Sequence, residues 1–549
     1  MTADIRRDDA FPRLTPEQLA RLRPLGRERR VADGEILFEQ GATDLPFYVV
    51  LEGSIAIVLP SPMGEHIVVV HEQAQFAGDV DTLSGHRAIV TGRARGAGVV
   101  LEIERARLVA LVQLDAELSE ILLRAFIMRR AFLLTQGRGD LVVIGSRYCA
   151  STLRLREFLT RNGLPHAYID VELERNVQAV LENFKVGVDD IPVVVGAKGL
   201  VLKRPTIEQV AGELGLNRVD DTVVRDVIVV GAGPAGLAAA VYAASEGLDV
   251  VVVEAEAPGG QAGTSSRIEN YLGFPTGITG LALTGRAFVQ AEKFGAEISV
   301  ARTAAGVRCD RRPYRVELAG GIALQTRTIV IATGAKYRKP DIANLGRFEG
   351  SGVYYAATQL EAKLCSDEEV VVVGGANSAG QAAVFLSGCA QRVHMLVRGP
   401  GLAETMSRYL VRRIEETSNL ALRTRTQIVE LEGERALERV TCVDAARGAR
   451  ETLPARHVFM MTGADPNTRW LQGCVALDEH GFVETDVALD EDKLRRARWP
   501  LAREPYQFET SLPGVFAVGD ARSRSVKRVA AAVGEGSACV QIIHRLLAE

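Results

Sequence analysis

The sequence predicts a multidomain chain: an N-terminal β jelly roll with a long helix, a small α/β module, and two larger α/β domains. Three observations lead to this prediction. The chain has 549 residues, far more than one core of about 150 residues uses. Short β-rich runs alternate with glycine turns over residues 30–103, a period-2 pattern typical of a small barrel or jelly roll. Two glycine-rich turns, starting at Gly231 and Gly374, indicate one nucleotide-binding fold used twice.

Composition narrows the function classes. The chain is 47% apolar and 24% charged with a formal net charge of −4, so it lacks the basic bias of a nucleic-acid binder. No apolar run reaches the roughly 18 residues that span a bilayer, and the first residues contain no secretion signal. We expect a cytoplasmic protein that binds neither nucleic acid nor membrane.

The seven cysteines are spread widely, and the nearest two in sequence, Cys365 and Cys389, lie 24 residues apart. This spacing contains no CxxC motif and no zinc-like cluster. It predicts no disulfide framework and no metal site, and we expect mostly buried thiols in a reducing compartment.

The front half divides into two parts. Residues 1–135 hold the β-rich runs and a helix over 104–134, which we expect to pair with a second subunit. Residues 140–217 read as strand, helix, strand, a second helical stretch, and then two strands and a helix. That order in fewer than 90 residues predicts a thioredoxin-like α/β module. A polar break near residue 224 ends it.

The first glycine-rich turn follows a strand and opens a helix. Gly231 permits the tight turn, and Gly233 lets the backbone approach a pyrophosphate at the helix N-terminus. Gly236 completes the pattern, and Glu254 closes the next strand, where an acid accepts hydrogen bonds from ribose hydroxyls. This context predicts dinucleotide binding.

The second turn departs from the pattern. Gly374 fills its first position, but Ala376 and Ala379 stand at the second and third. A methyl group at the second position lies where backbone should meet phosphate. We still expect nucleotide binding here, weakened or shifted, with a structural remnant of the fold as the alternative.

Residues 224–549 resemble the low-molecular-weight thioredoxin reductases of the pyridine nucleotide–disulfide oxidoreductase family. The motifs GAGPAGLAAA, PGGQ, IENYLGFP, IVIATGA, GGANSAG and MTGADPNT occur in family order. The resemblance implies two Rossmann-like domains: an FAD domain in two segments, 224–339 and 464–549, and an NAD(P)H domain inserted at 340–463. It also implies a homodimer and hydride transfer from NAD(P)H to FAD.

The resemblance also implies the cofactor contacts. Those to FAD are Gly231, Gly233, Pro234, Ala235, Gly236, Glu254, Gly260, Gln261, Asn270, Thr333, Gly334, Gly519, Asp520, Arg528, Val529 and Ala530; those to the nicotinamide nucleotide are Gly374, Ala376, Asn377, Ser378, Ala379 and Arg398. The family has Gln where this chain has Val529, which removes a polar partner of the flavin ring and predicts an altered potential.

The choice of nicotinamide nucleotide depends on arginine. The family's NADPH enzymes place a pair of arginines after the strand to grip the 2′-phosphate. This chain keeps Arg398 but has Gly399 as its neighbour, with Arg408 ten residues on from Arg398 as a substitute. We favour NADPH, with NADH as the rival.

The family's two redox cysteines are absent. Ala356 and Gln359 occupy their positions, and neither side chain can carry electrons. Electrons could leave the flavin directly to a small oxidant, pass to a one-electron protein partner, or reach a thiol elsewhere. We interpret Cys365, six residues beyond Gln359, as a buried apolar cysteine.

The front half resembles two further families. Residues 141–216 are similar to glutaredoxin-like modules, with Cys149 at a helix start, no resolving cysteine, and a cis peptide bond implied before Pro192. Residues 30–135 are similar to cyclic-nucleotide-binding domains. In that comparison Asp79 replaces the ribose-binding Glu, and Arg87 is the best candidate for the phosphate-binding Arg.

These observations favour an FAD-dependent NAD(P)H oxidoreductase that passes hydride to FAD and then to a small-molecule or protein electron acceptor. One alternative is thioredoxin-disulfide reductase activity through a thiol such as Cys149. The other is a regulatory flavoprotein with little turnover that senses a nucleotide at the barrel, with a cyclic nucleotide as the candidate ligand, and redox state at the flavin.

Overall fold

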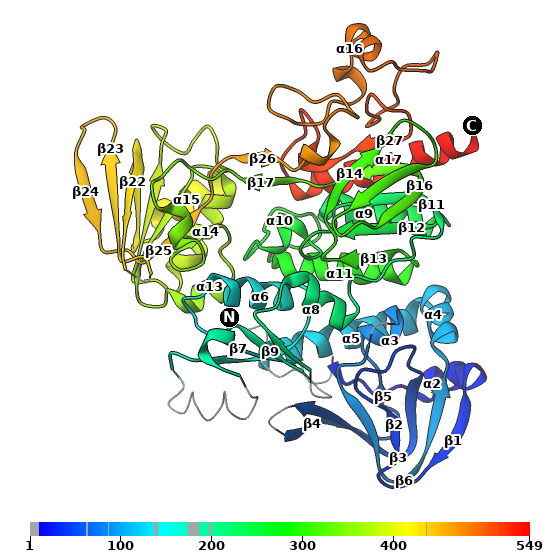
Figure 1. The fold of residues 1–549 in the computed structure, drawn as a ribbon. Helices are drawn as coiled ribbons and strands as arrows, with labels where there is room; N and C mark the ends of the chain where they lie inside the picture. Colours follow the sequence, from blue (N-terminus) through cyan, green and yellow to red (C-terminus); the bar gives the residue numbers. More distant parts are fainter. Residues whose placement is uncertain are drawn as a thin grey trace. The chain divides into compact units, whose positions relative to one another are not determined.

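The computed structural model is drawn in Figure 1. It describes residues 10–61, 64–85, 87–136, 141–173, 186–196, 200–434 and 436–549. The chain separates into two compact units, one built mainly from residues 1–219 and the other mainly from residues 220–549. No helix in the described part is long and apolar enough to span a bilayer.

The N-terminal domain is an antiparallel β-barrel. Its strands are β1 (Arg27–Val31), β2 (Ile36–Phe38), β3 (Phe47–Ser61), β4 (Gly64–His71), β5 (Phe76–Ala77) and β6 (Thr91–Ile103). They pair in the order β1-β6-β3-β4, with β2 on β6 and β5 on β3. Inward residues such as Val50, Ile55 and Val100 are almost fully buried. The predicted period-2 β domain is confirmed.

The helices of this domain are α2 (Pro16–Leu22), α3 (Val80–Ser84), α4 (Arg105–Leu114) and α5 (Ala116–Gln136). The prediction of one helix over 104–134 was wrong, because the helix breaks at Asp115, whose backbone is extended. The Asp115 carboxylate accepts a hydrogen bond from the Leu118 N–H at 3.0 Å and so caps the second helix.

The next segment forms a small mixed sheet. Its elements are β7 (Leu141–Gly145), α6 (Ala150–Arg161), β8 (His166–Asp170), β9 (Val193–Val195), β10 (Val201–Lys203) and α8 (Ile207–Leu214). The strand order is β10-β9-β7-β8, with β7 parallel to β8 and the other two pairs antiparallel. The Ile191–Pro192 bond is cis, as expected. The predicted second helical stretch lies outside the described residues.

A seven-stranded sheet anchors the second unit, and we call its domain the seven-stranded domain. Its strands are β11 (Val224–Val230), β12 (Val250–Glu254), β13 (Glu297–Val300), β14 (Ala304–Arg308), β15 (Tyr314–Leu318), β16 (Ala323–Ile331) and β27 (Val515–Ala517). The order is β13-β12-β11-β16-β15-β14, and β27 lies parallel to β16. Thus a strand from the C-terminal segment completes a sheet begun almost 300 residues earlier.

Three helices flank the glycine-rich regions of this domain. They are α9 (Pro234–Ser245), α10 (Gly260–Gly263) and α17 (Val529–Ala548). Helices α9 and α17 cross closely at Gly536. A Cβ added at this residue would lie 2.1 Å from the Ala235 carbonyl oxygen. Glycine is therefore required at this crossing.

A five-stranded parallel sheet lies between two short linkers, and we call its domain the five-stranded domain. Its strands β18 (Val353–Tyr354), β19 (Glu369–Val373), β20 (Arg392–Val397), β21 (Leu420–Thr424) and β25 (His457–Met460) pair as β18-β25-β19-β20-β21. Its helices are α13 (Gln359–Leu364), α14 (Asn377–Ser387) and α15 (Arg408–Glu416). The linkers β17 (Ala335–Tyr337) and β26 (Ala464–Pro466) pair antiparallel to each other (Figure 1).

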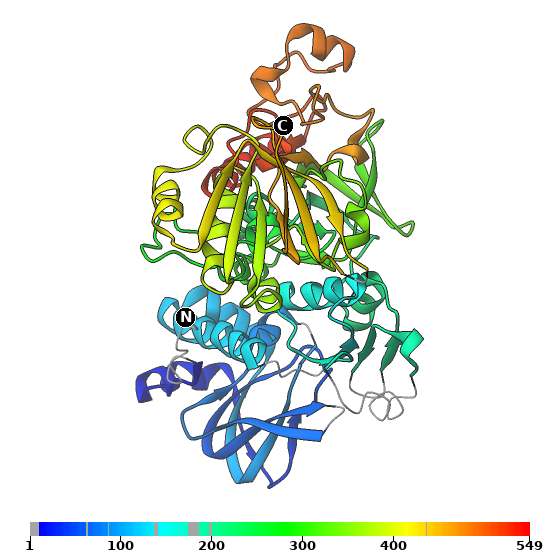
Figure 2. The ribbon, with the colours of Figure 1, turned by 90° about the vertical axis from the view of Figure 1, so that its left-hand side faces the viewer.

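The five-stranded domain has three layers. Val370 and Val372 face α14 and α15, whereas Val371 faces a separate antiparallel sheet. That sheet consists of β22 (Thr426–Glu432), β23 (Arg439–Asp444) and β24 (Arg450–Leu453), seen in yellow in Figure 2. Because successive strand residues point to opposite faces, a continuous valine run buries both sides.

Candidate functional site

The first glycine-rich turn combines two crowded glycines with one open glycine. A Cβ at Gly231, where φ is +105°, would lie 2.4 Å from the Ala332 carbonyl oxygen. A Cβ at Gly236 would lie 1.8 Å from the Gly231 carbonyl oxygen, but one at Gly233 would meet nothing within 4 Å. Gly233 caps α9 and Pro234 begins it. The fold therefore holds the turn tight and leaves room at the helix N-terminus, where an anion binds.

Glu254 lies beneath this turn and is 8% exposed. Its Oε2 accepts the Ala232 N–H at 2.7 Å, and its Oε1 accepts the Glu256 N–H at 2.8 Å. These two bonds fix the orientation of the carboxylate, whose oxygens are hydrogen-bond acceptors of the kind that ribose hydroxyls require. Glu254, which the sequence predicts to bind a ribose, thus also stabilises the glycine-rich turn through its hydrogen bond with Ala232.

The loop after β16 holds an unsatisfied hydroxyl. The Oγ1 of Thr333 is buried without a hydrogen-bond partner. Next to it, Gly334 has φ of +62° and open space where a Cβ would be. Asn467 fixes the backbone of this loop. Its Nδ2 donates to the Thr333 carbonyl oxygen at 3.0 Å, and its N–H donates to the Gly334 carbonyl oxygen at 3.0 Å. A buried hydroxyl that lacks a partner fits a site that binds a polar molecule.

The PGGQ segment lies against the same turn. A Cβ at Gly260, where φ is +51°, would lie 3.1 Å from the Gly233 Cα. The Gln261 amide donates a hydrogen bond to the Ala335 carbonyl oxygen in linker β17. Asn270 is exposed in the loop between Ile268 and Ile278, which form an isolated bridge. The structure thus brings Gly260 and Gln261 to the turn.

The C-terminal motif reaches the turn from the other side. Gly519 has φ of +67°, and a Cβ there would lie 2.9 Å from the Ala235 Cβ. Burial raises the pKa of Asp520, and the neighbouring Lys527 partly offsets this. Arg528 caps the start of α17, which begins at Val529 and continues through Ala530. The structure thus brings Gly519 against Ala235 at the start of α9.

The second glycine-rich turn has similar constraints at its start. A Cβ at Gly374, where φ is +142°, would lie 2.3 Å from the Met461 carbonyl oxygen. Ala376 caps α14 and is exposed, whereas Ala379 is fully buried. The Ala376 methyl therefore lies on the accessible side of the turn. A methyl group on that side lies where a bound phosphate would approach the turn.

Two predicted nucleotide contacts already have protein partners. The Asn377 Oδ1 accepts the Ser407 N–H at 2.8 Å and so joins the starts of α14 and α15. The Ser378 hydroxyl hydrogen-bonds to Tyr337, whose pKa is raised by burial. Arg398 and Arg408 are both exposed. In the part of the chain that the structure describes, neither guanidinium has a hydrogen bond or an ion pair.

The two positions at which the resemblance places redox cysteines lie at a helix start. Ala356 is partly buried between β18 and α13, and Gln359 begins α13. The Thr358 N–H donates to the Glu361 Oε2 at 2.8 Å, which caps this helix. Burial raises the pKa of Glu361. The structure thus places Ala356 just before a capped helix and Gln359 at its first residue.

Cys365 has no exposed surface and packs in the apolar core beneath α14, so its interpretation as a buried apolar cysteine is confirmed. Burial, together with the adjacent Cys389 thiol, raises the pKa of Cys365 to about 12. The contact with Cys389 was not foreseen, because the two thiols meet only through the packing of α13 against the end of α14.

Cys149 is half-buried immediately before α6. Burial alone would raise the pKa of its thiol. Hydrogen bonds from the backbone N–H groups of Thr152 and Ser151 outweigh that effect, and the net result is a pKa below the usual value. A lowered pKa increases the thiolate fraction at neutral pH.

In the barrel, Asp79 caps α3 and accepts the Asp81 N–H at 2.9 Å. Arg130 lies 3.2 Å from the Asp79 carboxylate and 2.5 Å from that of Asp81. Burial, and then Asp81, raise the pKa of Asp79 to about 6. Arg87 is half-buried at the following turn. Asp79 therefore has a structural role that the sequence did not indicate.

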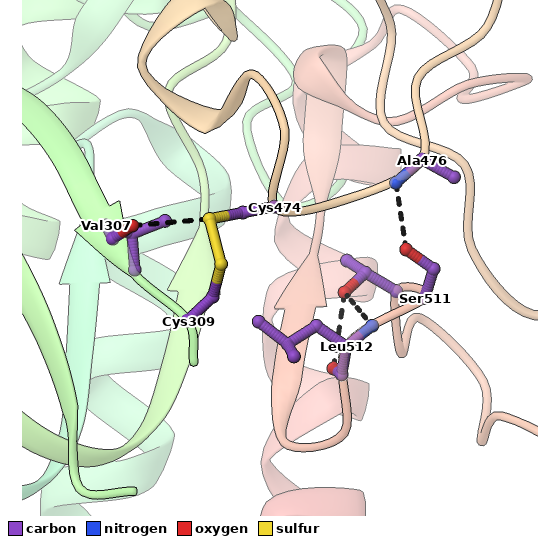
Figure 3. Close-up of a disulfide and its surroundings, with 7 residues drawn as sticks. Val307, Cys309, Cys474, Ala476, Ser511 and Leu512 are labelled. Carbon is purple, nitrogen blue, oxygen red and sulfur yellow. Dashed lines mark hydrogen bonds between the residues drawn. A yellow bond between two sulfur atoms is a disulfide. The ribbon is translucent and has the colours of Figure 1, made fainter. Parts of the chain in front are cut away.

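The structure overturns the expectation of no disulfide. Cys309, after β14, and Cys474, after the short helix Arg469–Leu471, form a disulfide with a Cα–Cα distance of 6.0 Å (Figure 3). The Cys474 Sγ also lies 3.2 Å from the Val307 carbonyl oxygen. The two cysteines are 165 residues apart with the whole five-stranded domain between them, so their spacing gave no signal.

Comparison with known proteins gives two family matches. Residues 225–536 match the pyridine nucleotide-disulphide oxidoreductase model, and residues 28–115 match the cyclic nucleotide-binding domain model.

Relatives and solved structures agree with these matches. The thioredoxin reductase of Bacillus subtilis (strain 168) is 31% identical over 327 residues, which cover 59% of this chain and 96% of the relative. That of Mycolicibacterium smegmatis is 32% identical over 326 residues, which cover 59% and 97%. The crystal structure of Lactococcus lactis thioredoxin reductase in the FR conformation matches with a TM-score of 0.53 at 25% identity, covering 59% of this chain and 99% of that chain.

Proposed function

The chain belongs to the pyridine nucleotide-disulphide oxidoreductase family, and from that premise we propose an FAD-dependent NAD(P)H oxidoreductase that works without a local redox dithiol. The chain is a thioredoxin reductase-like flavin oxidoreductase with a cyclic nucleotide-binding domain at its N-terminal end. The proposal concerns the cofactor contacts, the route of the electrons and the role of the front half.

The residues of the seven-stranded domain fit FAD. Gly233 leaves open space at a helix N-terminus, Glu254 is oriented for a ribose, and the Thr333 hydroxyl lacks a partner inside the protein. When bound, FAD accepts a hydride from the reduced nicotinamide and releases two electrons to an acceptor. The protein's own contribution is to bind and orient, and no side chain is required as acid or base.

The five-stranded domain supplies the nicotinamide site. Gly374 and Ala376 form the phosphate turn, and Asn377 holds α15 against it through Ser407. Arg398 directly follows β20, and its guanidinium forms no ion pair or hydrogen bond within the described part of the chain. An unpaired guanidinium at the end of β20 favours NADPH over NADH, because NADPH carries an additional negative group, the 2′-phosphate.

Two residues, one just before α13 and one at its start, determine the proposed route of the electrons. Ala356 stands at the position of the family's first redox cysteine, and Gln359 at that of the second. Neither side chain can form a disulfide or a thiolate. Electrons therefore leave the flavin toward an acceptor outside this helix: a quinone-type or oxygen oxidant, or a one-electron protein partner.

Cys149 favours a second candidate, thioredoxin-disulfide reductase activity through the front module. Its pKa is lowered by hydrogen bonds from Thr152 and Ser151, as a nucleophilic thiol requires. The strand order β10-β9-β7-β8 around it supports the glutaredoxin-like assignment of residues 140–217. On this route the Cys149 thiolate would attack a substrate disulfide, release one thiolate and form a mixed disulfide. The electron pair of the reduced flavin would then cleave that mixed disulfide and release Cys149 and the second thiolate.

A third candidate is nucleotide sensing at the barrel, with a cyclic nucleotide as its ligand and with little turnover at the flavin. The match to the cyclic nucleotide-binding domain over residues 28–115 favours it. Asp79 and Arg87 are the proposed contacts, although the Asp79 carboxylate already faces Arg130. The assembly expected for all three candidates is a homodimer.

The test is anaerobic stopped-flow reduction of the purified holoprotein by NADPH and by NADH. Reoxidation by a quinone, by O₂, by a one-electron acceptor and by a disulfide then follows, in wild type and in Cys149→Ser. Rapid bleaching and acceptor-specific reoxidation are expected, with Cys149→Ser unchanged for the small oxidants. Loss of disulfide reoxidation in Cys149→Ser would establish the second candidate instead. Absence of bleaching with both nucleotides would refute the enzyme proposal and leave the sensor.

A further inference from the structure

The end of strand β21 places an arginine beside Arg398. Strands β20 and β21 are parallel neighbours, and Val397, the last residue of β20, is in register with Thr424, the last residue of β21. Arg398 and Arg425 are the next residues along each strand. In parallel sheets ligands bind beyond the carboxyl ends of the strands, so both arginines lie at the binding edge.

The backbone holds Arg425 against the turn where the family's second arginine is missing. The Arg425 N–H donates to the Gly399 carbonyl oxygen at 3.0 Å, and its own carbonyl accepts the Ala445 N–H at 2.7 Å. Arg425 has φ of +52°, a left-handed conformation that a non-glycine residue adopts only when its surroundings impose it. These two hydrogen bonds fix the residue beside Gly399.

The space and the charge at this point are both available. A Cβ at Gly399 would meet only the Gly401 carbonyl oxygen, at 3.9 Å. Arg425 is exposed, and among the described residues its guanidinium has no hydrogen bond or ion pair. Its strand neighbour Arg423 differs, because it pairs with both carboxylate oxygens of Glu451.

We propose that Arg425 and Arg398 together bind the 2′-phosphate of NADPH, so that the arginine lost at Gly399 is replaced from the adjacent strand. The inference rests on the proposed use of a nicotinamide nucleotide and names the residue that selects the phosphorylated form. Two planar guanidinium groups can each contact a phosphate through paired N–H donors, which gives both affinity and geometric selection. Arg425 is thus a specificity-determining residue that sequence proximity to Arg398 does not reveal.

The experiment measures binding to the holoprotein by isothermal titration calorimetry, with NADP⁺, NAD⁺ and 2′-AMP as probes. The variants are Arg425→Ala, Arg398→Ala and Arg408→Ala. Arg412→Ala is the control because it removes an equal charge from exposed α15. We expect Arg425→Ala to weaken NADP⁺ and 2′-AMP binding by about tenfold or more, with NAD⁺ binding changed less than about twofold. Arg425→Lys should recover part of the loss.

Three outcomes in the variants would overturn the inference. They are equal weakening of NADP⁺ and NAD⁺ binding in Arg425→Ala, a loss no larger than in Arg412→Ala, or selective weakening in Arg408→Ala in place of Arg425→Ala. Wild-type protein that binds NADP⁺ no better than NAD⁺ would also overturn it. Failure of the proposed function is distinct, since in that case neither NADPH nor NADH would bleach the flavin of the wild-type protein. Circular dichroism and FAD content confirm that each variant is folded.

Discussion

Arg413 on α15 of the five-stranded domain pairs with Glu269 of the seven-stranded domain, with its Nη1 2.9 and 2.8 Å from the two carboxylate oxygens. The two domains are joined covalently only through the linkers β17 and β26. Their relative orientation in this unit therefore depends on noncovalent contacts such as this pair. Because Ser407, at the start of the same helix, binds Asn377 of the nucleotide turn, the pair connects that turn to the flavin side.

Breaking this pair should slow flavin reduction. The side chains of Arg413 and Glu269 are 44% and 24% exposed, so we expect a contribution of about 0.5–1 kcal/mol, or roughly two- to fivefold in the rate of bleaching by NADPH. The measurement is a double-mutant cycle with Glu269→Gln, Arg413→Gln and the double variant, by anaerobic stopped flow at low and high salt. Additive effects of the two single changes would mean that the pair does not set the orientation.

The unsatisfied Thr333 hydroxyl predicts opposite responses in two states of the protein. Thr333→Val removes a buried polar group that has no partner in the protein, so the apoprotein should be unchanged or more stable. In the FAD-bound protein the same change should remove a hydrogen bond worth about 1 kcal/mol. Thermal unfolding with and without added FAD should therefore show a smaller stabilisation by FAD in Thr333→Val than in wild type.

Thr328→Val is the matched control for that measurement. Thr328 is fully buried on β16, the strand that precedes the Thr333 loop, and its hydroxyl donates to the Asp226 carbonyl oxygen at 2.7 Å. Its replacement should destabilise the apo and FAD-bound proteins equally. An equal loss in both states for Thr333→Val would argue that its hydroxyl does not contact FAD.

Features that depend on residues close together in the sequence were predictable from the sequence. Gly231 and Gly236 were predicted from spacing, and the structure explains them, since a side chain at either would collide with backbone. The break at Asp115 was missed because helical periodicity continues through it, and only the cap shows where one helix ends. The Cys309–Cys474 bond and the proximity of Arg425 to Gly399 depend on contacts between distant segments, which a single sequence does not encode in its spacing.

The disulfide should be detectable by counting thiols. The denatured, unreduced protein should react with five equivalents of a thiol reagent, and the reduced protein with seven. Removing the bond by Cys309→Ser should lower the free energy of unfolding by about 2–4 kcal/mol, because the link closes a long loop in the unfolded chain. Cys442→Ser serves as a control for loss of a cysteine that forms no disulfide. Seven reactive thiols without reductant would show that the bond does not form.

The barrel should lose stability as the pH rises from about 4 to about 6. In the folded state the pKa of Asp79 is raised to about 6 by burial and by Asp81, against an ordinary value near 3.8, despite the nearby Arg130. Between about pH 4 and pH 6 the folded state therefore binds the Asp79 proton more tightly than the unfolded state does. The free energy of unfolding falls as the pH rises through this range. Above about pH 6 this contribution no longer changes with pH. Asp79→Asn keeps an acceptor for the α3 cap but removes the charge, so it should stabilise the protein at pH 7 by about 1 kcal/mol or more and flatten this pH dependence. Urea unfolding at several pH values, followed by a probe in the barrel, measures both effects. A variant with the same pH profile as wild type would assign the dependence to other groups.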